Sequence, residues 1–465
     1  MLTMKPVHIS LLTALLGLLV VAAAPEDKPK GKGGKGGDKG AGAGGQVEPA
    51  IVPPYLFNVW LCRAGADSVT ASVIAWEAME AFINYGDGLK TAAVKLEPGT
   101  PQSLVMGGLK PDTSYSYQLT YRRTGGEATQ DVVRHFHTQR AAGSSFTFVM
   151  QADSHLDLNT DVRVYQQTLT NMLADKPDFM IDLGDTTMVD KFGKFYTRSE
   201  SQYLGQRYYM GRIAHSVPIF MVLGNHDGER GDRIEMANWS VGMRHKFFPN
   251  PTDGNDKHSY YAFEWGNALF VALDPFWNIA NRSEGNWSMT LGEEQYRWLT
   301  ATLEKSRSPF KFVFIHHLVG GLGRDARGGV TPAPYMEWGG RNLDGSEGFK
   351  EHRPGWALPI HQLLVKNGVS AVFHGHDHLF AREELDGIIY QEVPQPGHPG
   401  GGTRSAEEYG YTGVILGSSG HVRVTVDPQS AKVDYVRSII PGITKGNLPN
   451  ASVEHSYTLK PRAGR

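Results

Sequence analysis

Five short polar motifs each follow an apolar run, and together they contain the residue types that bind transition metals. The motifs are Asp153-Ser154-His155, Gly184-Asp185, Gly224-Asn225-His226-Asp227, His316-His317 and His374-Gly375-His376-Asp377-His378. Neutral imidazole and carboxylate ligands suit Mn, Fe or Zn, whereas oxygen ligands alone would favour Mg or Ca. The motifs contain no cysteine, which argues against a structural zinc site held by thiolates.

The number of candidate ligands is too large for one tetrahedral ion but suits two ions. The candidates are Asp153, His155, Asp185, Asn225, His316, His376 and His378. A carboxylate can bridge two ions that lie about 3.5–4 Å apart, and such a pair can hold both sides of an in-line displacement at phosphorus. The short D-x-H and H-x-H spacings suit extended segments in which alternate side chains point the same way. The pattern therefore predicts a centre with two metal ions.

The apolar runs before the motifs are typical of strands buried on both faces of a sheet. The runs in this part of the chain are Phe146–Gln151, Phe179–Leu183, Ile219–Leu223, Leu269–Leu273, Phe312–Ile315 and Ala371–Phe373. Apolar residues at helical spacing predict a helix over 161–174, and residues 421–436 are typical of a hairpin. Ligands of an open α/β sheet bind at the carboxyl ends of its strands. We therefore expect five strands to bring the motifs to one edge.

The ordered set of motifs resembles the calcineurin-like metallophosphoesterase superfamily over residues 153–378. The resemblance implies an α/β (α+β) four-layer sandwich with two central mixed sheets. It also implies an exported phosphoesterase that hydrolyses phosphomonoesters or phosphodiesters, with a small-molecule phosphoester as substrate. Two divalent or trivalent ions (Mn, Fe or Zn) would lower the pKa of a bound water. The hydroxide formed from it would attack phosphorus without a covalent enzyme intermediate.

The same resemblance implies a role for each motif residue. One metal would be held by Asp153, His155 and His378, and Asp185 would bridge both ions. The second metal would be held by Asn225, His316 and His376, with His316 preferred over His317. His226 would lie just outside the metal ligands and donate to the phosphoryl oxygen or the leaving group, and Asp227 would orient it.

Short β segments with turn residues between them occupy residues 55–140. The spacing Leu109-x-Pro111-x-Thr113-x-Tyr115 resembles the tyrosine corner of fibronectin type III-like sandwiches. Such a sandwich before this catalytic core resembles the purple acid phosphatases. That family places a metal-binding tyrosine three residues after the bridging aspartate, where this chain has Met188. We therefore expect no tyrosinate colour, and the methionine argues against a dedicated ferric site.

These patterns divide the chain into five predicted segments. They are a signal peptide at 1–24, a Gly/Lys-rich disordered linker at 25–50, a fibronectin III-like domain at 51–141, a metallophosphoesterase domain at 145–440 and a C-terminal tail at 441–465. The first follows from an apolar run, residues 9–24, that ends in small residues. It predicts a secreted or periplasmic protein without a transmembrane anchor after cleavage, although an uncleaved anchor stays open as an alternative.

Composition limits the partners and the covalent cross-links of the chain. The formal net charge is -2, so we predict no specific nucleic-acid partner. Cys62 is the single cysteine, which excludes an intramolecular disulfide. The oligomeric state is left open by the sequence.

Other polar and aromatic residues carry weaker indications. A structural or surface role is the preferred interpretation for His258, His352, His374, His398 and His421, and solvated loop positions for Asp157 and Asp190. The Gly/Pro-rich region 320–359 could bind substrate through its arginines and tryptophans or merely pack on the core; these residues are Arg324, Arg327, Trp338, Arg341 and Trp356. Two alternatives to a general phosphatase remain, namely a binding or scaffold protein with a vestigial metal site, and a nucleotidase or phospholipid-cleaving specificity.

Overall fold

The structure is a computed structural model of the chain. It describes residues 52–53, 55–252, 258–279, 286–318 and 327–462. The predicted signal peptide and linker lie outside these ranges, as does Arg324. None of the helices within the described ranges is long and apolar enough to cross a bilayer.

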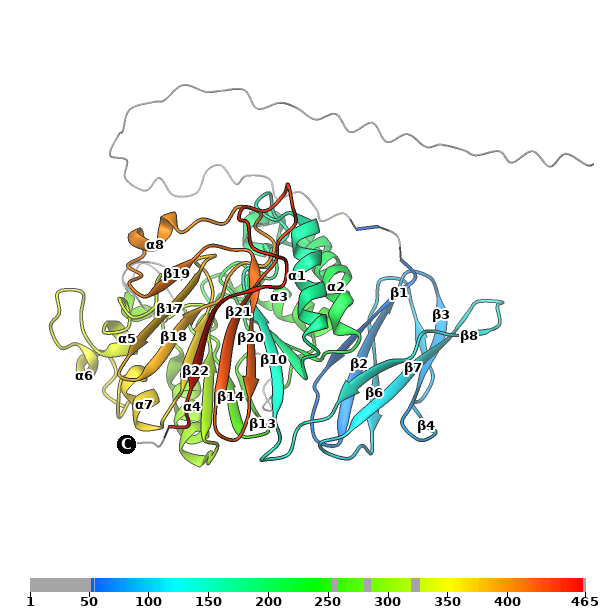
Figure 1. Ribbon diagram of the computed structural model, residues 1–465, viewed down its shortest axis with the longest axis horizontal. Helices are drawn as coiled ribbons and strands as arrows, with labels where there is room; N and C mark the ends of the chain where they lie inside the picture. Colours follow the sequence, from blue (N-terminus) through cyan, green and yellow to red (C-terminus); the bar gives the residue numbers. More distant parts are fainter. Residues whose placement is uncertain (1–51, 54, 253–257, 280–285, 319–326, 463–465) are drawn as a thin grey trace, which may run out of the picture. The chain divides into compact units, whose positions relative to one another are not determined.

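The first part of the described chain is a small all-β domain of two sheets (Figure 1). One sheet has the order β1 (Phe57–Cys62), β2 (Ser68–Ala75), β6 (Gln102–Gly107). The other has the order β4 (Leu89–Lys90), β3 (Met79–Tyr85), β7 (Ser114–Arg123), β8 (Ala128–Gln130), with β5 (Val94–Leu96) on β3 and β9 (Arg134–His137) on β7. Alternate residues such as Val59, Leu61, Ile83 and Leu119 point inward and form one core.

The predicted tyrosine corner has the expected hydrogen bond. The hydroxyl of Tyr115 accepts the backbone N–H of Lys110 at 2.8 Å. This contact ties the start of β7 to the segment before it, as in a tyrosine corner. The assignment to the fibronectin type III class itself stays a prediction.

The second part contains two larger mixed sheets. The first has the order β12 (Ile219–Met221), β11 (Phe179–Asp182), β10 (Phe146–Gln151), β20 (Gly420–Val426), β21 (Ala431–Arg437), β22 (Val453–Leu459). The second has the order β13 (Tyr261–Trp265), β14 (Ala268–Ala272), β15 (Phe310–Phe314), β16 (Ala371–His374), β18 (Ile388–Glu392), β17 (Phe380–Leu385), β19 (Val414–Leu416). Strands β10, β11 and β12 pair in parallel, as do β14, β15, β16 and β18.

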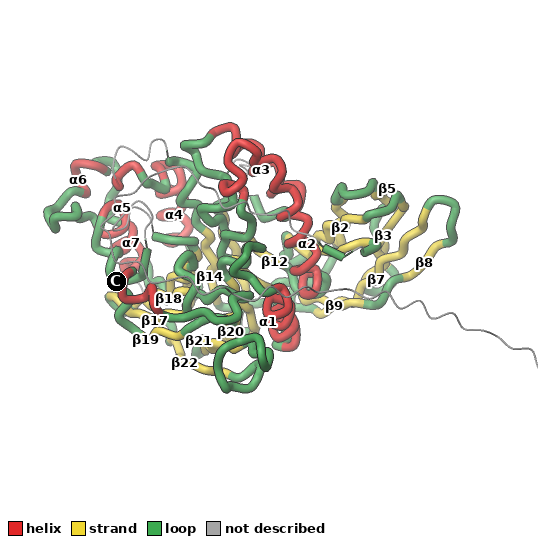
Figure 2. The backbone as a smooth tube through the Cα atoms, turned by 90° about the horizontal axis from the view of Figure 1, so that it is seen from above, coloured by secondary structure: helices red, strands yellow, loops and turns green. Residues whose placement is uncertain are grey.

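Phenylalanines fill the space between these two sheets. The ring centroids of Phe148 of β10 and Phe270 of β14 lie 5.1 Å apart in an edge-to-face arrangement, and both side chains are fully buried. Helices cover the outer faces, because the alternate side chains of each strand are apolar as well. The first sheet packs on α1 (Val162–Ala174), α2 (Glu200–Ala214) and α3 (Ile234–Phe247), and the second on α4 (Gly292–Lys305) and α7 (Ile360–Lys366) (Figure 2). The predicted four-layer sandwich is confirmed.

The region 441–465 differs from the predicted tail, because β22 lies within it and pairs antiparallel with β21. Its alternating residues Val453, His455, Tyr457 and Leu459 are typical of a strand at the edge of a sheet. The prediction missed it because a turn-rich segment, residues 438–452, separates it from the preceding hairpin.

Helix α2 joins the all-β domain to the larger sheets through a buried arginine. The Arg207 guanidinium donates to Asn58 Oδ1 at 3.0 Å, to Ser72 Oγ and O at 3.0 and 2.9 Å, and to the carbonyl of Phe247 at 2.8 Å. Burial lowers its pKa to about 10. Gly211 on the same helix allows this contact, since a Cβ there would lie 1.9 Å from Asn58 Nδ2.

Candidate metal centre

The five motifs meet at the carboxyl ends of strands from both sheets. Asp153 follows β10, Asp185 follows β11 and Asn225 follows β12 in the first sheet. In the second sheet His316 follows β15, while His376 and His378 follow β16. Parallel strands present their carboxyl ends at one edge, which places residues distant in sequence side by side.

Glycines in the motifs let the loops touch main chain to main chain. A Cβ on Gly184 would lie 2.3 Å from the backbone nitrogen of Gly224, and one on Gly224 would lie 2.0 Å from that of Asp185. A Cβ on Gly375 would lie 2.7 Å from Ala152 Cβ, beside the first motif. Any side chain at these positions would force the loops apart, which explains the glycine in three of the motifs.

One group of ligand atoms is formed by Asp153, His155 and His378, whose atoms lie within 4.8 Å of one another. The two Nε2 atoms of His155 and His378 are 3.3 Å apart, and His378 Nε2 lies 3.3 Å from Asp153 Oδ1. The three atoms converge on one point, as ligands of one cation do.

A second group is formed by Asp185, His316 and His376, also within 4.8 Å. His316 Nε2 lies 3.2 Å from Asp185 Oδ2 and 3.9 Å from Asp153 Oδ1, so the two groups adjoin. His316 Nδ1 donates to the carbonyl of Leu183 at 2.9 Å. This bond orients the ring with Nε2 toward the carboxylates, which is how ligand histidines are usually fixed.

Each central aspartate has one oxygen held by a backbone amide and the other facing imidazoles. Asp185 Oδ1 accepts the N–H of His226 at 2.7 Å, and Asp153 Oδ2 accepts the N–H of His376 at 2.8 Å. The backbone of Asp153, Asp185, His376 and His378 is in the left-handed region, with φ of 57°, 51°, 88° and 61°. Such conformations are costly for residues with side chains and cluster at functional sites.

Several buried oxygen and nitrogen atoms at this point have no hydrogen-bond partner within the described ranges. They include the Oδ1 atoms of Asp153 and Asn225 and the Nε2 atom of His376. Buried polar atoms are nearly always paired, so three unpaired atoms in one place would cost a metal-free protein stability. The unpaired atoms of Asp153 and His376 belong to the two ligand groups and fit metal ligation, while the place of Asn225 in the second group stays a prediction.

The charges of this cluster favour a cation. Burial would raise the pKa of Asp185, but the neighbouring His316 and His226 rings outweigh it and hold the pKa well below its ordinary value. Burial would lower the pKa of His316, but Asp185 outweighs it and raises the pKa to about 10. The carboxylates therefore stabilise positive charge at this point, which a proton or a metal ion can supply.

Helix α2 supports the two loops that carry the aspartates. Gln206 is fully buried, and its Nε2 donates to the carbonyls of Ser154 at 2.9 Å and Thr186 at 2.7 Å. Its Oε1 accepts the hydroxyl of Tyr165 at 3.0 Å. Ser154 lies between two predicted ligands and Thr186 follows Asp185. Gln206 thus holds both loops, next to the residue that contacts the all-β domain.

The structure pairs the His226 side chain with Asp190, and not with Asp227 as the sequence suggested. Asp227 Oδ2 accepts the N–H groups of Gly224 at 2.8 Å and Asp185 at 3.0 Å. Asp227 Oδ1 accepts the N–H of Thr187 at 2.8 Å and its hydroxyl at 2.9 Å. Burial, aided by Asp185, raises the pKa of Asp227 to about 7. His226 Nδ1 donates to Asp190 Oδ1 at 2.8 Å, so Asp190 is not a solvated loop acid. The backbone amides of both loops thus hold the Asp227 carboxylate away from the His226 ring.

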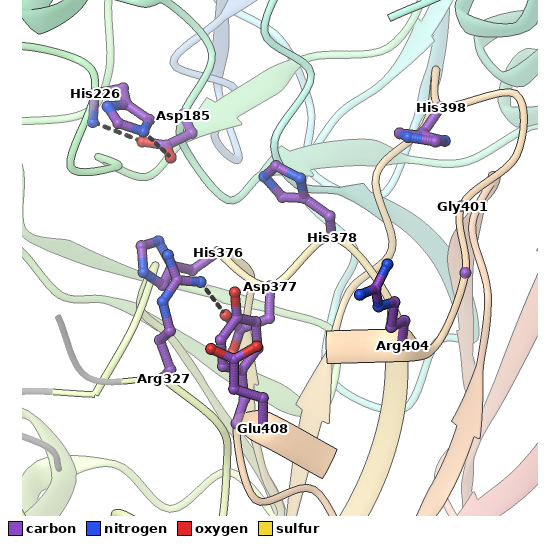
Figure 3. Close-up of a pocket in the computed structure, with 12 residues that line it drawn as sticks. Asp185, His226, Arg327, His376, Asp377, His378, His398, Gly401, Arg404 and Glu408 are labelled. Atoms are coloured by element: carbon purple, nitrogen blue, oxygen red, sulfur yellow. Dashed lines mark hydrogen bonds and ion pairs between the residues drawn. The ribbon is translucent and has the colours of Figure 1, made fainter. Parts of the chain in front are cut away.

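A pocket of about 540 Å³ opens at the predicted metal ligands (Figure 3). It is lined by Asp185, His226, His376 and His378, together with residues that the motifs did not indicate: Arg327, His398, Gly401, Gly402, Arg404, Glu408 and Tyr409. His398, for which a structural or surface role was expected, lies in the wall of this pocket. Its glycine-rich surroundings, residues 397–402, were the available indication of a loop close to a ligand.

Four of the weaker candidates make structural contacts. His374 Nδ1 contacts Glu392 at 2.6 Å, and His421 contacts Asp175 at 2.8 Å. Trp338 Nε1 donates to the Tyr390 hydroxyl at 2.8 Å, and Trp356 stacks on Tyr296 at 3.8 Å, so both tryptophans pack the 327–359 segment onto the core. Arg327 differs, because it lines the pocket while Nη1 contacts Asp377 at 2.5 Å.

Comparisons with known proteins agree with this arrangement. Purple acid phosphatase 13 of Arabidopsis thaliana is 24% identical over 332 residues, which cover 65% of this chain and 51% of that relative. The chain thus spans about half the length of this curated relative. Among solved structures, purple acid phosphatase PPD1 from yellow lupin (Lupinus luteus) has a TM-score of 0.60 at 18% identity, covering 86% of this chain and 74% of that one. PhoD has a TM-score of 0.60 at 14% identity, covering 87% and 90%.

These two structures share the fold with this chain. The family model described as calcineurin-like phosphoesterase matches residues 146–380, just over half of the chain. The predicted superfamily is confirmed. The chain belongs to the calcineurin-like phosphoesterase family.

Proposed function

We propose that this protein hydrolyses phosphomonoesters or phosphodiesters at a centre of two metal ions. The observation that carries the proposal is the pair of adjoining ligand groups, Asp153/His155/His378 and Asp185/His316/His376. Asn225 adds a buried oxygen without a hydrogen-bond partner among the described residues. The family resemblance gives Asp185 the bridging place, and its Oδ2 lies 3.2 Å from His316 Nε2 while its Oδ1 is fixed by a backbone amide.

The ligand set suits Mn, Fe or Zn. When bound, two such ions would supply Lewis acidity toward the phosphoryl oxygens and lower the pKa of a ligated water. Met188 is buried at the position where a purple enzyme has its tyrosine ligand. We therefore propose a colourless centre without a tyrosinate ligand.

His226 is the proposed proton donor. Its Nδ1–H is held by Asp190, which directs Nε2 toward the pocket, where it lies 3.8 Å from Asp185 Oδ2. Asp190 accepts the Nδ1–H and favours the protonated ring, which can carry the proton that a leaving alkoxide needs. Asp190 acts through this ring and is a positioning residue.

The test uses the chelated protein and defined metals. Mn, Fe or Zn is added back, and hydrolysis of p-nitrophenyl phosphate and bis(p-nitrophenyl) phosphate is measured at each metal ratio. We expect turnover that saturates at two ions per chain. Absence of turnover with two ions bound would refute the hydrolase and favour a binding or scaffold protein. A nucleotide and phospholipid panel then tests a nucleotidase or phospholipid-cleaving specificity.

We further propose that the protein is exported. The proposal is supported by the sequence of residues 1–24 alone, an apolar run that ends in small residues. N-terminal sequencing of protein from the native host would give a start near residue 25. An intact Met1 on the exported or membrane-bound protein would instead indicate an uncleaved anchor.

A further inference from the structure

One rim of the pocket carries cationic groups that the proposed chemistry at the metal ligands does not use. The rim is the segment 398–404, which contributes His398, Gly401, Gly402 and Arg404 to the pocket. Figure 3 shows His398 and Arg404 on one side of His378, and Asp377 and Glu408 on the other. Lys445 packs against this rim. A Cβ placed on Gly400 would lie only 3.2 Å from the Cε of Lys445.

The cations of this rim are not neutralised by acids of the described chain. Arg404 is exposed and forms no hydrogen bond or ion pair with a described residue. Lys445 has no carboxylate within ion-pair distance in the same ranges. His398 Nδ1 accepts the N–H of Gly400 at 3.1 Å, which leaves Nε2 as the donor of a neutral ring. Two nearby acids are engaged: Asp377 is bound by Arg327 and by the N–H of Gly328 at 2.8 Å, and Asp157 lies beside His155 at 3.4 Å. The third, Glu408, lines the pocket on the other side of His378 and forms no ion pair with Arg404 (Figure 3).

The pocket is larger than the reacting group requires. Its volume of about 540 Å³ is within the range of about 300–1,000 Å³ that is typical of small-molecule sites. A phosphoryl group at the metal ligands leaves room for the alcohol part of the ester. A Cβ on Gly402 would have only Arg404 N, at 3.9 Å, as a near neighbour, so this glycine leaves the wall open; a Cβ on Gly401 would instead lie 2.5 Å from Ser418 Cβ.

We propose that Arg404, His398 and Lys445 bind a second anionic group on the alcohol part of the substrate. Preferred substrates are then phosphoesters whose alcohol carries a further phosphate or a carboxylate. This inference rests on the proposed hydrolysis and adds the class of substrate. The planar guanidinium of Arg404 suits both anions, because a phosphate and a carboxylate can each accept two parallel N–H hydrogen bonds from it.

The test compares substrates and variants as a ratio. The substrates are a sugar bisphosphate, a phosphorylated hydroxy acid and glycerol phosphate, whose alcohol is neutral. Charge-assisted hydrogen bonds contribute enough that losing one weakens binding by roughly 10–100-fold. We therefore expect Arg404→Met to lower kcat/KM for the anionic alcohols, relative to glycerol phosphate, by about 10–100-fold. Arg404→Lys and Lys445→Met should each lower the same ratio by less than Arg404→Met.

Arg122→Met is the matched control, since Arg122 is an exposed arginine on β7 of the all-β domain. It should leave the ratio unchanged. The bisphosphate and the hydroxy acid distinguish a second phosphate from a carboxylate as the bound group. An unchanged ratio in Arg404→Met for both substrates would overturn the proposal. An equal loss on all three substrates would overturn it too, because it would indicate damage to the metal centre.

A binding measurement keeps this test separate from turnover. Methylphosphonate and 3-phosphonopropionate share a phosphonate, and only the second carries another anion. Calorimetry on the metal-loaded protein should show tighter binding of 3-phosphonopropionate, and Arg404→Met should abolish the difference. If no ester is hydrolysed but this difference is present, the proposed function fails while the anion site stands. Equal binding of the two phosphonates to the unmodified protein would refute the site.

Discussion

Replacement of Gln206 by leucine tests whether α2 positions the metal loops. Leucine has a similar volume but cannot form the hydrogen bonds of the glutamine. The substitution would leave the carbonyls of Ser154 and Thr186 and the hydroxyl of Tyr165 without the partners that now lie at 2.9, 2.7 and 3.0 Å. Each buried group left unpaired costs about 1–3 kcal/mol. Because the neighbours relax, we expect a loss of about 3–5 kcal/mol in the free energy of unfolding.

The same substitution should weaken metal binding. The two carbonyls belong to the loops that carry Asp153, His155 and Asp185, so the loops lose the bond that holds them together. Loss of a residue that supports metal ligands usually lowers metal affinity by about 10–100-fold. We expect a weakening of this size in a calorimetric titration of Mn or Zn into the chelated protein, measured well below its melting temperature.

Gln295 provides a matched control for this experiment. It is equally buried, and its Nε2 donates to the carbonyl of Asp274 at 2.7 Å while its Oε1 accepts the N–H of Asp274 at 2.8 Å. It lies on α4, behind the second sheet, and supports no predicted ligand loop. Gln295→Leu should therefore lower stability by a similar amount and leave metal affinity within twofold. Equal metal affinity of the two variants would refute the positioning role of Gln206.

Three further predictions concern the centre and the domain contact. Asp185→Asn should lower the metal content and remove nearly all activity, as measured by elemental analysis and p-nitrophenyl phosphate turnover; full metal content would show that Asp185 is no bridge. His226→Ala should keep both ions and slow turnover by roughly 10²–10⁴-fold, and an emptied site would contradict its place outside the ligands. Arg207→Met should leave the buried acceptors of Asn58 and Ser72 unpaired and destabilise the protein by about 3–5 kcal/mol in urea unfolding. A change below 1 kcal/mol would show that this contact does not hold the domains together.

The ligand set could be predicted from the sequence because it depends on strand ends. A buried strand needs a continuous apolar run, and the residue after it lies at the edge where ligands bind. Phe146–Gln151 before Asp153 and Ala371–Phe373 before His376 are examples, and both runs form parallel strands as predicted. The structure brings six of the seven predicted ligands into two groups, and the place of Asn225 and the role of each residue stay proposals.

Contacts that depend on loop conformation could not be predicted in this way. Asp190 reaches His226 from a position 36 residues away, and nothing in its local sequence distinguishes it from a solvated acid. Asp227, adjacent to His226, was the simpler choice, but the turn directs its carboxylate to backbone amides. Arg404 and His398 lie in a segment without periodicity, so their place at the pocket follows only from the folded structure.

The most direct test of the account counts the metal ions and locates them. The protein is crystallised with Mn or Zn, and anomalous diffraction is recorded on both sides of the absorption edge of the metal. We predict two anomalous peaks, one among Asp153, His155 and His378 and one among Asp185, Asn225, His316 and His376. A single peak, or peaks away from these side chains, would contradict the account.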